Sequence, residues 1–360
     1  MNADVRGVFR DFHEFDVPLS QTLDDKDYCL ACADKRSDVW VPFLSFPITK
    51  RCNFRCAYCG VGGEATASDN AQIEPQQIRT IVSLAAQKGI RKFRLTGGEP
   101  FTHREVGRIL EIFNEFGYFT LINTNGSLLT EHEGLLRTLR SNFRFAVSLD
   151  TLVPERLKEI SCVDMHKQII DGIMLLRELG LLMRINTVVT QMNFHEIPDI
   201  LSFCQKLGCD LKLLDVVSVP VPFGDRQSIY QEISTLERKM SEGCDEILSH
   251  EYTRGFGTPC KRYRFGKTCV TVKNSVKGSH YDIGDGGLCC KCQYYPCHEG
   301  LYDIFALSDG RLCSCRWTEV QKCEKMDSQL DFLINAFRRS VFVSRSSNAD
   351  MCARTELLVE

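Results

Sequence analysis

Apolar segments of two kinds alternate along the chain between about residues 41 and 225. Short runs rich in aliphatic and β-branched residues predict strands over 41–49, 92–96, 118–123, 144–149, 182–190 and 210–217. Between these runs, apolar positions recur every three or four residues, which predicts helices over 76–88, 104–115, 131–140, 166–179 and 195–207. Strands that alternate with helices form parallel sheets through right-handed crossovers. We therefore expect an α/β fold.

The number of strand–helix units narrows this expectation. Six units are fewer than the eight of a closed TIM barrel, so we expect a partial (β/α)6 barrel of that type. In such folds the chemistry gathers at the C-terminal ends of the strands. Motifs that follow directly after a predicted strand are therefore the first candidates for a functional site.

The amino-acid composition changes after the barrel segment. A charged stretch predicts a connecting helix, and the part that follows is rich in Gly and Cys, with short predicted strands over 269–273 and 301–307. Asp309-Gly310 is typical of a tight hairpin turn. We divide the chain into an N-terminal extension (1–40), the barrel (41–225), a connecting helix (226–251), a cysteine-rich domain (252–326), and a C-terminal helix and tail (327–360).

Charge and composition exclude several classes of protein. The 360 residues carry 44 Lys and Arg against 47 Asp and Glu, a balance that favours neither nucleic acid nor an anionic membrane as partner. No apolar run approaches the ~18 residues of a membrane span, and the N-terminus lacks a signal peptide, so we expect a cytoplasmic protein. In that reducing compartment, the 19 cysteines point to metal ligation rather than disulfides.

Three cysteines lie on one short segment just after the first predicted strand. Cys52, Cys56 and Cys59 have the spacing C-x3-C-x2-C. Three thiolates on one loop can hold three corners of an iron–sulfur cubane and leave the fourth iron open, whereas ferredoxin clusters are closed by a fourth cysteine. Taken alone, the spacing also permits a zinc site that lacks one ligand, or three incidental thiols.

A second motif, Leu-Thr-Gly-Gly-Glu-Pro at residues 95–100, follows the next predicted strand and reaches the same end of the barrel. Its glycines allow close backbone approach, and its glutamate can accept hydrogen bonds from an ammonium group. With both motifs in this order, the chain resembles the radical S-adenosylmethionine (SAM) superfamily. The resemblance implies a [4Fe–4S] cluster on Cys52, Cys56 and Cys59 whose open iron binds SAM. It also implies reductive cleavage of SAM to a 5′-deoxyadenosyl radical that abstracts hydrogen from a substrate.

The resemblance extends to later strand ends. Thr-Asn-Gly follows the third predicted strand, Ser-Leu-Asp ends the fourth, and Arg-Ile-Asn lies on the fifth. It implies that the residues which contact SAM are Tyr58, Gly97, Gly98, Glu99, Thr124, Asn125, Ser148, Asp150 and Arg184. Each also has an ordinary structural interpretation, as a turn, a strand terminus or a surface side chain.

Six cysteines lie within residues 289–315, on both sides of the predicted hairpin. A tetrahedral zinc site is one interpretation. The segment also resembles the twitch or SPASM-like extension of radical SAM enzymes, which implies an auxiliary [4Fe–4S] cluster. By that likeness the candidate ligands are Cys289, Cys292, Cys297 and Cys315, with Cys315 preferred to Cys313 and Cys289 as a possible fourth ligand. Cys290 competes for the same places, while Cys29 and Cys32 are expected to be core thiols.

The pattern is nearest to the branch that contains the GTP 3′,8-cyclase of molybdenum cofactor biosynthesis, but it departs from it. The branch's auxiliary segment carries arginines that bind GTP, where this chain has Gln-Tyr-Tyr-Pro at residues 293–296. His103 replaces another arginine. Because guanidinium groups recognise phosphates by paired hydrogen bonds, these departures argue against GTP as substrate.

The resemblance therefore implies a radical SAM enzyme that acts on a small-molecule natural-product or cofactor precursor. It would receive electrons from a donor such as flavodoxin or ferredoxin. Three alternatives stay open: a peptide-modifying enzyme of the same superfamily, the GTP cyclase itself, and a non-catalytic iron–sulfur or zinc protein with a regulatory role. Fold and cofactor do not fix the substrate.

Overall fold

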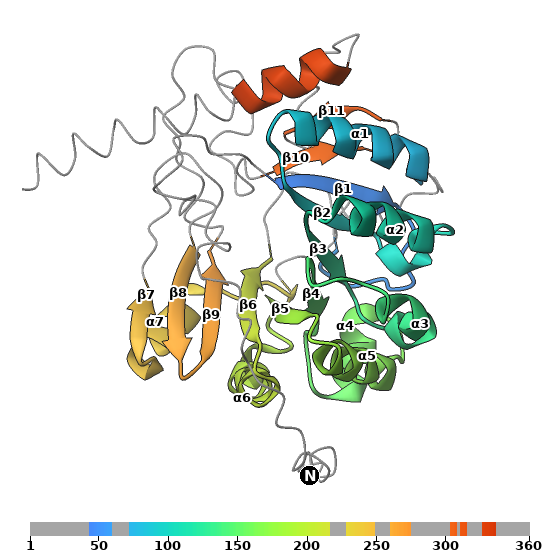
Figure 1. The fold of residues 1–360 in the computed structure, drawn as a ribbon. Coiled ribbons are helices and arrows are strands. Elements are labelled where there is room, and N and C mark those ends of the chain that lie inside the picture. The colour runs from blue at the N-terminus through green and yellow to red at the C-terminus, as the bar shows by residue number, and fades with distance from the viewer. Residues whose placement is uncertain are drawn as a thin grey trace, which may run out of the picture.

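A computed structural model describes residues 43–59, 72–216, 228–248, 260–274, 303–307, 310–314 and 326–335. Their strands form one sheet in the order β11-β10-β1-β2-β3-β4-β5-β6-β9-β8-β7 (Figure 1). The first six are β1 Phe43–Thr49, β2 Lys92–Gly97, β3 Phe119–Thr124, β4 Phe143–Ser148, β5 Leu182–Val189 and β6 Asp210–Asp215. They pair in parallel, each with the next along the chain.

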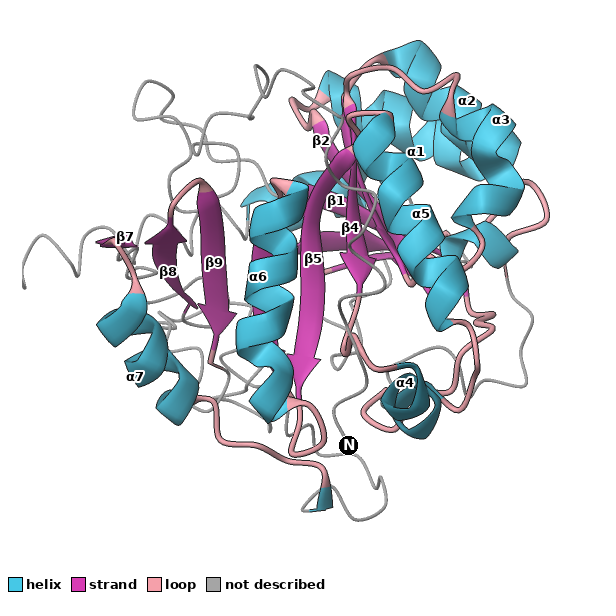
Figure 2. Cartoon of the chain, turned by 90° about the horizontal axis from the view of Figure 1, so that it is seen from below, coloured by secondary structure: helices cyan, strands magenta, loops and turns pink. Residues whose placement is uncertain are grey.

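Helices connect these strands and lie along the outer face of the sheet, as the view from below shows (Figure 2). They are α1 Pro75–Gln87, α2 Val106–Phe116, α3 Glu133–Leu136, α4 Pro154–Ser161, α5 His166–Glu178 and α6 Ile197–Leu207. The main core fills the space between helices and sheet, where Phe46, Phe93 and Phe113 are fully buried and pack ring against ring. The prediction of an α/β fold with a partial TIM-type barrel is thus confirmed.

Strands from the C-terminal part of the chain extend the same sheet at both sides. β10 (Asp303–Ala306) pairs in parallel with β1, and β9 (Thr268–Lys273) pairs in parallel with β6. Antiparallel strands then follow outward: β11 (Leu312–Cys313) on β10, and β8 (Cys260–Phe265) and β7 (Glu246–Leu248) beyond β9. The segment 252–326, predicted as a separate domain, therefore supplies strands to the barrel sheet.

A buried ion pair fixes β10 in place. Arg94 of β2 and Ser45 of β1 both contact the carboxylate of Asp303, whose side chain is fully buried. β10 and β11 pair antiparallel, with Gly310 at φ 81° and the amide of Leu307 donating to the carbonyl of Arg311. Residues far apart in the sequence are thus joined at one edge of the barrel.

Several elements differ from the prediction. α4 was not expected, because half of its sequence, Pro-Glu-Arg-Leu-Lys-Glu-Ile-Ser, is charged. The predicted helix over 131–140 is only the four residues of α3 after a 3-10 turn. In the predicted connector, helix α7 covers only Ser234–Gly243 and strand β7 follows it. A last helix occupies residues 326–335. None of the described helices is long and apolar enough to cross a membrane.

Candidate functional site

The predicted cluster cysteines lie on the segment that follows β1, residues 50–59, which we call the cysteine loop. Its first half is fixed by the end of β2, because the amide of Gly98 donates to Thr49 (2.8 Å) and that of Glu99 to Arg51 (2.7 Å). Its second half is fixed by the C-terminus of α4, whose free carbonyls accept bonds from the amides of residues 55 and 57. These backbone bonds give the loop a defined shape.

The three thiols of the loop suit a multi-iron cluster. Cys52, Cys56 and Cys59 form no disulfide and are partly buried, and burial raises the pKa of Cys52 to about 11 and that of Cys56 further. A metal would have to displace those protons, as metal binding to thiols does. Among the described residues, no three His, Cys, Asp or Glu side chains converge on a single-ion site. Three thiolates on one loop could hold three corners of a cubane.

Glu99 lies at the end of β2 and is only 1% exposed. Its carboxylate accepts bonds from the hydroxyl of Thr124 (2.7 Å) and from the amides of Asn125 (2.6 Å) and Phe101 (3.1 Å). Burial raises the pKa of Glu99 to about 7 in spite of these bonds. No cation among the described residues pairs with it. A ligand ammonium group would supply the missing positive charge, so the site fits the amine of SAM.

The turn after β3 also contacts the cysteine loop. Asn125 donates through Nδ2 to Asn53 Oδ1 (2.8 Å), and Asn53 donates to the hydroxyl of Ser127 (2.9 Å). Ser127 in turn donates to Asn125 Oδ1 (2.7 Å). This closed ring of side chains joins the third strand end to the loop. Sequence analysis missed Asn53, although its place between two motif cysteines was a signal.

The fourth strand end reaches the loop through one contact. The hydroxyl of Tyr58 donates to Asp150 Oδ2 at 2.5 Å, and the other carboxylate oxygen of Asp150 accepts from the amide of Val188 (2.8 Å). Burial raises the pKa of Asp150 to about 6 and, together with the charge of Asp150, raises that of Tyr58. Two residues predicted as separate SAM contacts are thus bonded to each other.

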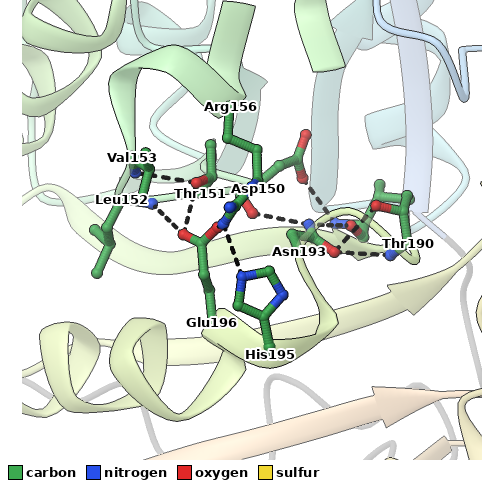
Figure 3. Close-up of polar contacts among 10 residues, drawn as sticks. Asp150, Thr151, Leu152, Val153, Arg156, Thr190, Asn193, His195 and Glu196 are labelled. Atoms are coloured by element: carbon green, nitrogen blue, oxygen red, sulfur yellow. Dashed lines mark hydrogen bonds and ion pairs between the residues drawn. The ribbon is translucent and has the colours of Figure 1, made fainter. Parts of the chain in front are cut away.

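A second buried network stands behind Asp150 (Figure 3). Asn193, fully buried, donates to the carbonyls of Asp150 and Val188, both at 2.8 Å. Glu196 accepts from the hydroxyl of Thr151 (2.6 Å) and pairs with Arg156. These contacts hold the turn after β4 against the turn after β5. Nothing in the sequence patterns indicated them, because they join two loops by side chains.

Cationic residues gather on the inner face of the sheet, opposite the helices. Phe93 and Leu95 of β2 pack in the helix-side core, so the alternate residue Arg94 points inward. The same alternation places Arg184 of β5, Lys212 of β6 and Lys273 of β9 on this face. Burial and the charges of Arg184, Lys273 and Arg94 lower the pKa of Lys212 to about 7, against a smaller opposing effect of Cys260. This face is suited to an anion.

The remaining predicted residues are placed as follows. Arg184 donates to Asn186 Oδ1 (2.9 Å) on its own strand, and the register sets Ser148 beside Asn186. Gly97 ends β2 at φ 128°, a conformation that favours glycine. His103 is 3% exposed, and its bonds to the described residues are to backbone, so we interpret it as a packing residue. The predicted auxiliary ligands Cys289, Cys292, Cys297 and Cys315 lie outside the described residues.

Comparison with known proteins gives consistent results. Residues 46–204 match the family described as the radical SAM superfamily. A probable GTP 3′,8-cyclase from Methanocaldococcus jannaschii is 30% identical over 222 residues, which are 61% of this chain and 72% of that protein. A probable GTP 3′,8-cyclase from Sulfurisphaera tokodaii is 31% identical over 292 residues, 79% of this chain and 84% of that protein.

Solved structures share the fold at lower identity. SuiB from Streptococcus suis, bound to S-adenosylmethionine, superposes with a TM-score of 0.55 at 17% identity, over 82% of this chain and 65% of SuiB. Native anSMEcpe with bound AdoMet gives a TM-score of 0.54 at 17% identity, over 82% of both chains. At these identities the likeness shows the fold alone.

Proposed function

This chain belongs to the radical SAM superfamily, and we propose that it reductively cleaves S-adenosylmethionine at a [4Fe–4S] cluster held by Cys52, Cys56 and Cys59. The observation that supports this most is the convergence of three strand ends on one loop: β2 through Glu99, β3 through Asn125 and β4 through Asp150. When bound, the cluster supplies the electron that splits SAM into methionine and a 5′-deoxyadenosyl radical, which takes a hydrogen atom from the substrate.

The protein's own groups bind and orient SAM. Glu99 attracts the amine, because a buried carboxylate without a cation gains most from a ligand of positive charge. Arg184 on the inner face neutralises the SAM carboxylate, and Ser148, which lies beside Asn186 in register, donates a hydrogen bond. Tyr58 lies beside the adenine. Phe43, Leu121 and Met183 form an apolar cluster at the opposite end of the inner face. This cluster would exclude water from that end of the site.

The substrate that best fits the inner face is a small anion. Lys212 and Lys273 add cationic groups to this face, beside Arg94, which pairs with Asp303, and Arg184, which is assigned to the SAM carboxylate. A phosphate or carboxylate group of a natural-product or cofactor precursor would complement them. An electron donor such as flavodoxin or ferredoxin, in the reducing cytoplasm, completes the proposed system.

GTP is a second candidate for the substrate. The relatives named as GTP 3′,8-cyclases favour it, and the inner face offers cations for a triphosphate. The missing arginines around residues 293–296 and the packed His103 oppose it. We therefore propose GTP as a less favoured substrate than an unidentified anionic small molecule. A peptide substrate has no observation in its favour among the described residues.

An auxiliary [4Fe–4S] cluster is the third part of the proposal, with Cys289, Cys292, Cys297 and Cys315 as its ligands. Similarity to the Sulfurisphaera tokodaii relative over 292 residues supports an extension of the likeness beyond the barrel. Cys313 is buried within β11, and the resemblance favours Cys315 over it as a ligand. Roughly eight irons per chain would then be found after reconstitution.

The first test measures 5′-deoxyadenosine after anaerobic reconstitution, with dithionite and SAM. Wild type should form it, Cys56→Ala should not, and Cys204→Ala should behave as wild type because Cys204 is a core thiol. No product from wild type would favour the non-catalytic alternative. Adding GTP then separates the substrate candidates, since consumption of GTP would identify the cyclase. About four irons with one tightly held zinc would refute the auxiliary cluster.

A further inference from the structure

Asn53 lies on the cysteine loop directly after Cys52, and its side chain bonds to the turn after β3. Its Oδ1 accepts from Asn125 Nδ2 (2.8 Å), and its Nδ2 donates to the hydroxyl of Ser127 (2.9 Å). A weaker contact joins the same Nδ2 to the sulfur of Met165 at 3.6 Å. Both ends of this amide are therefore bonded within the protein, so that the side chain links the loop to the turn.

The turn after β3 is itself held in one shape. Asn125 Oδ1 accepts from both the amide (3.0 Å) and the hydroxyl (2.7 Å) of Ser127, which is 1% exposed. From the helix side, α5 packs on the turn through Gly172, where a Cβ would stand 2.5 Å from the carbonyl oxygen of Gly126. The turn is thus fixed through both its side chains and its backbone.

The same turn orients Glu99. The amide of Asn125 donates to Glu99 Oε2 at 2.6 Å, and the hydroxyl of Thr124 donates to Oε1 at 2.7 Å. The hydroxyl of Thr124 also accepts from the amide of Gly126 (3.0 Å). Asn125 therefore has two separate contacts: its main chain orients the carboxylate, and its side chain is bonded to the cysteine loop. A displacement of the loop would reach the carboxylate through this one residue.

We propose that Asn53 is a positioning residue that fixes Glu99 relative to the cysteine loop, through Ser127 and Asn125, and thereby sets the affinity for the amine of SAM. This inference rests on the proposed function, since it takes Glu99 as the acceptor of the amine and the loop as the holder of the cluster. It gives a role to a residue between the motif cysteines, and it lets Asn125 act on SAM through Glu99.

The physical argument concerns the part of the loop that backbone bonds do not hold. Bonds to the main chain fix the loop at Arg51 and again at residues 55 and 57. Between these points, residues 52–54 form no backbone–backbone hydrogen bond with the described part of the chain. The side-chain ring holds this middle segment. Without it, the segment and the carboxylate would have to be ordered when SAM binds, and that ordering costs affinity.

Two substitutions open the ring at different corners. Asn53→Ala removes the partner of Asn125 Nδ2 and of the Ser127 hydroxyl, while the backbone bonds of the loop stay. Ser127→Ala removes the hydroxyl and keeps the bond from the amide of residue 127 to Asn125. If the ring acts as a unit, the two variants should have similar effects, and the double variant should be no worse than either alone.

Asn142→Ala is the matched control. Asn142 is also partly buried, and it donates to the carbonyl of Tyr118 at 2.8 Å. It directly precedes β4, and Tyr118 directly precedes β3, so this bond joins the same two strands at the end opposite to the turn. A general effect of losing an asparagine hydrogen bond between these strands would be common to both variants.

The experiment measures SAM binding by calorimetry in the anaerobically reconstituted full chain, together with iron content and with urea unfolding of the metal-free chain. 5′-Methylthioadenosine is the second ligand, because it keeps the adenosine part of SAM but has no amine. We expect Asn53→Ala and Ser127→Ala to weaken SAM binding about tenfold and to leave iron content and 5′-methylthioadenosine binding near wild type. Asn142→Ala should bind both ligands as wild type does. In the Glu99→Gln background, Asn53→Ala should weaken SAM binding less than it does alone.

Three outcomes would overturn the inference. These are wild-type affinity for SAM in Asn53→Ala, an equal loss of affinity for both ligands, or an equal loss with and without the Glu99 carboxylate. Loss of iron without a change in SAM affinity would also contradict it, since the ring would then only hold the cysteines. Ser127→Ala decides the matter if Asn53→Ala does not fold. Absence of a cluster or of SAM binding in wild type would instead refute the proposed function, so the two failures are distinguishable.

Discussion

The carbonyl oxygen of Arg51 accepts a 2.7 Å hydrogen bond from the amide of Glu99, and this contact sets the cysteine loop against the end of β2. Gly98 lies directly at the junction: a Cβ there would stand 2.0 Å from that same carbonyl oxygen. The expectation that this glycine allows close approach is thus met by the protein's own backbone. Gly98 serves to seat the loop that carries the cluster ligands.

Gly98→Ala should therefore displace the loop. We expect a loss of about 1–3 kcal/mol in unfolding free energy, typical of overpacking, and iron content well below wild type after reconstitution. Urea unfolding and iron analysis measure the two effects. Gly107→Ala is the control, because a Cβ there has its nearest neighbour at 3.9 Å and a helix favours alanine. Equal iron in both variants would contradict this role of Gly98.

The buried pair of Arg94 and Asp303 should carry much of the attachment of β10 to β1. Asp303→Ala leaves a cation with 16% exposure without its carboxylate, so we expect a cost of about 3–5 kcal/mol in urea unfolding. Glu115→Ala breaks a surface pair with Arg79 and should cost no more than about 1 kcal/mol. Similar costs for the two variants would show that the buried pair does not hold the strand.

Much of this architecture could be predicted because parallel strands buried on the sheet leave continuous apolar runs. β1 to β6 have that signal, and most of the helices between them have apolar residues at every third or fourth position. β8, with the sequence Cys-Lys-Arg-Tyr-Arg-Phe, does not, since its alternate residues are cationic. The pairing of β10 with β1 could not be foreseen either, because it joins segments separated by more than two hundred residues.

The candidate site was predictable to a similar degree. Motif residues at strand ends could be found because each follows an apolar run at a fixed edge of the sheet. Their partners could not be assigned, since bonds such as Tyr58 to Asp150 depend on how two loops approach each other. Lys212 also escaped notice: a single lysine in a strand is ordinary until the alternation of neighbouring strands shows which face it shares.

Cys162 ends α4 in a left-handed conformation, with φ 58°, and is exposed. Glycine adopts this conformation without strain, so Cys162→Gly should stabilise the fold by about 1 kcal/mol. Cys162→Ala should give no such gain, because alanine keeps the Cβ that causes the strain. Urea midpoints of the two variants measure the difference, and an equal effect would mean that the turn is not strained.

Lys212 should make anion binding dependent on pH. With its pKa lowered to about 7, the ammonium is present below this value and is lost above it, so anion affinity should fall as pH rises. The groups that face it are Arg94 on β2, Arg184 on β5, Cys260 on β8 and Lys273 on β9. The lowered pKa of Lys212 lies inside the pH range of the measurement, so its charge should change there.

Sulfate is the suitable probe for this prediction, since its own charge is constant between about pH 6 and 9. Calorimetry should show a dissociation constant that rises by up to about tenfold per pH unit above the pKa of Lys212. Lys212→Arg should bind sulfate with little pH dependence, because a guanidinium does not titrate in this range. Lys212→Met should bind weakly at every pH. If wild-type affinity does not change with pH, Lys212 is not part of the anion site, and the case for an anionic substrate then rests on Lys273.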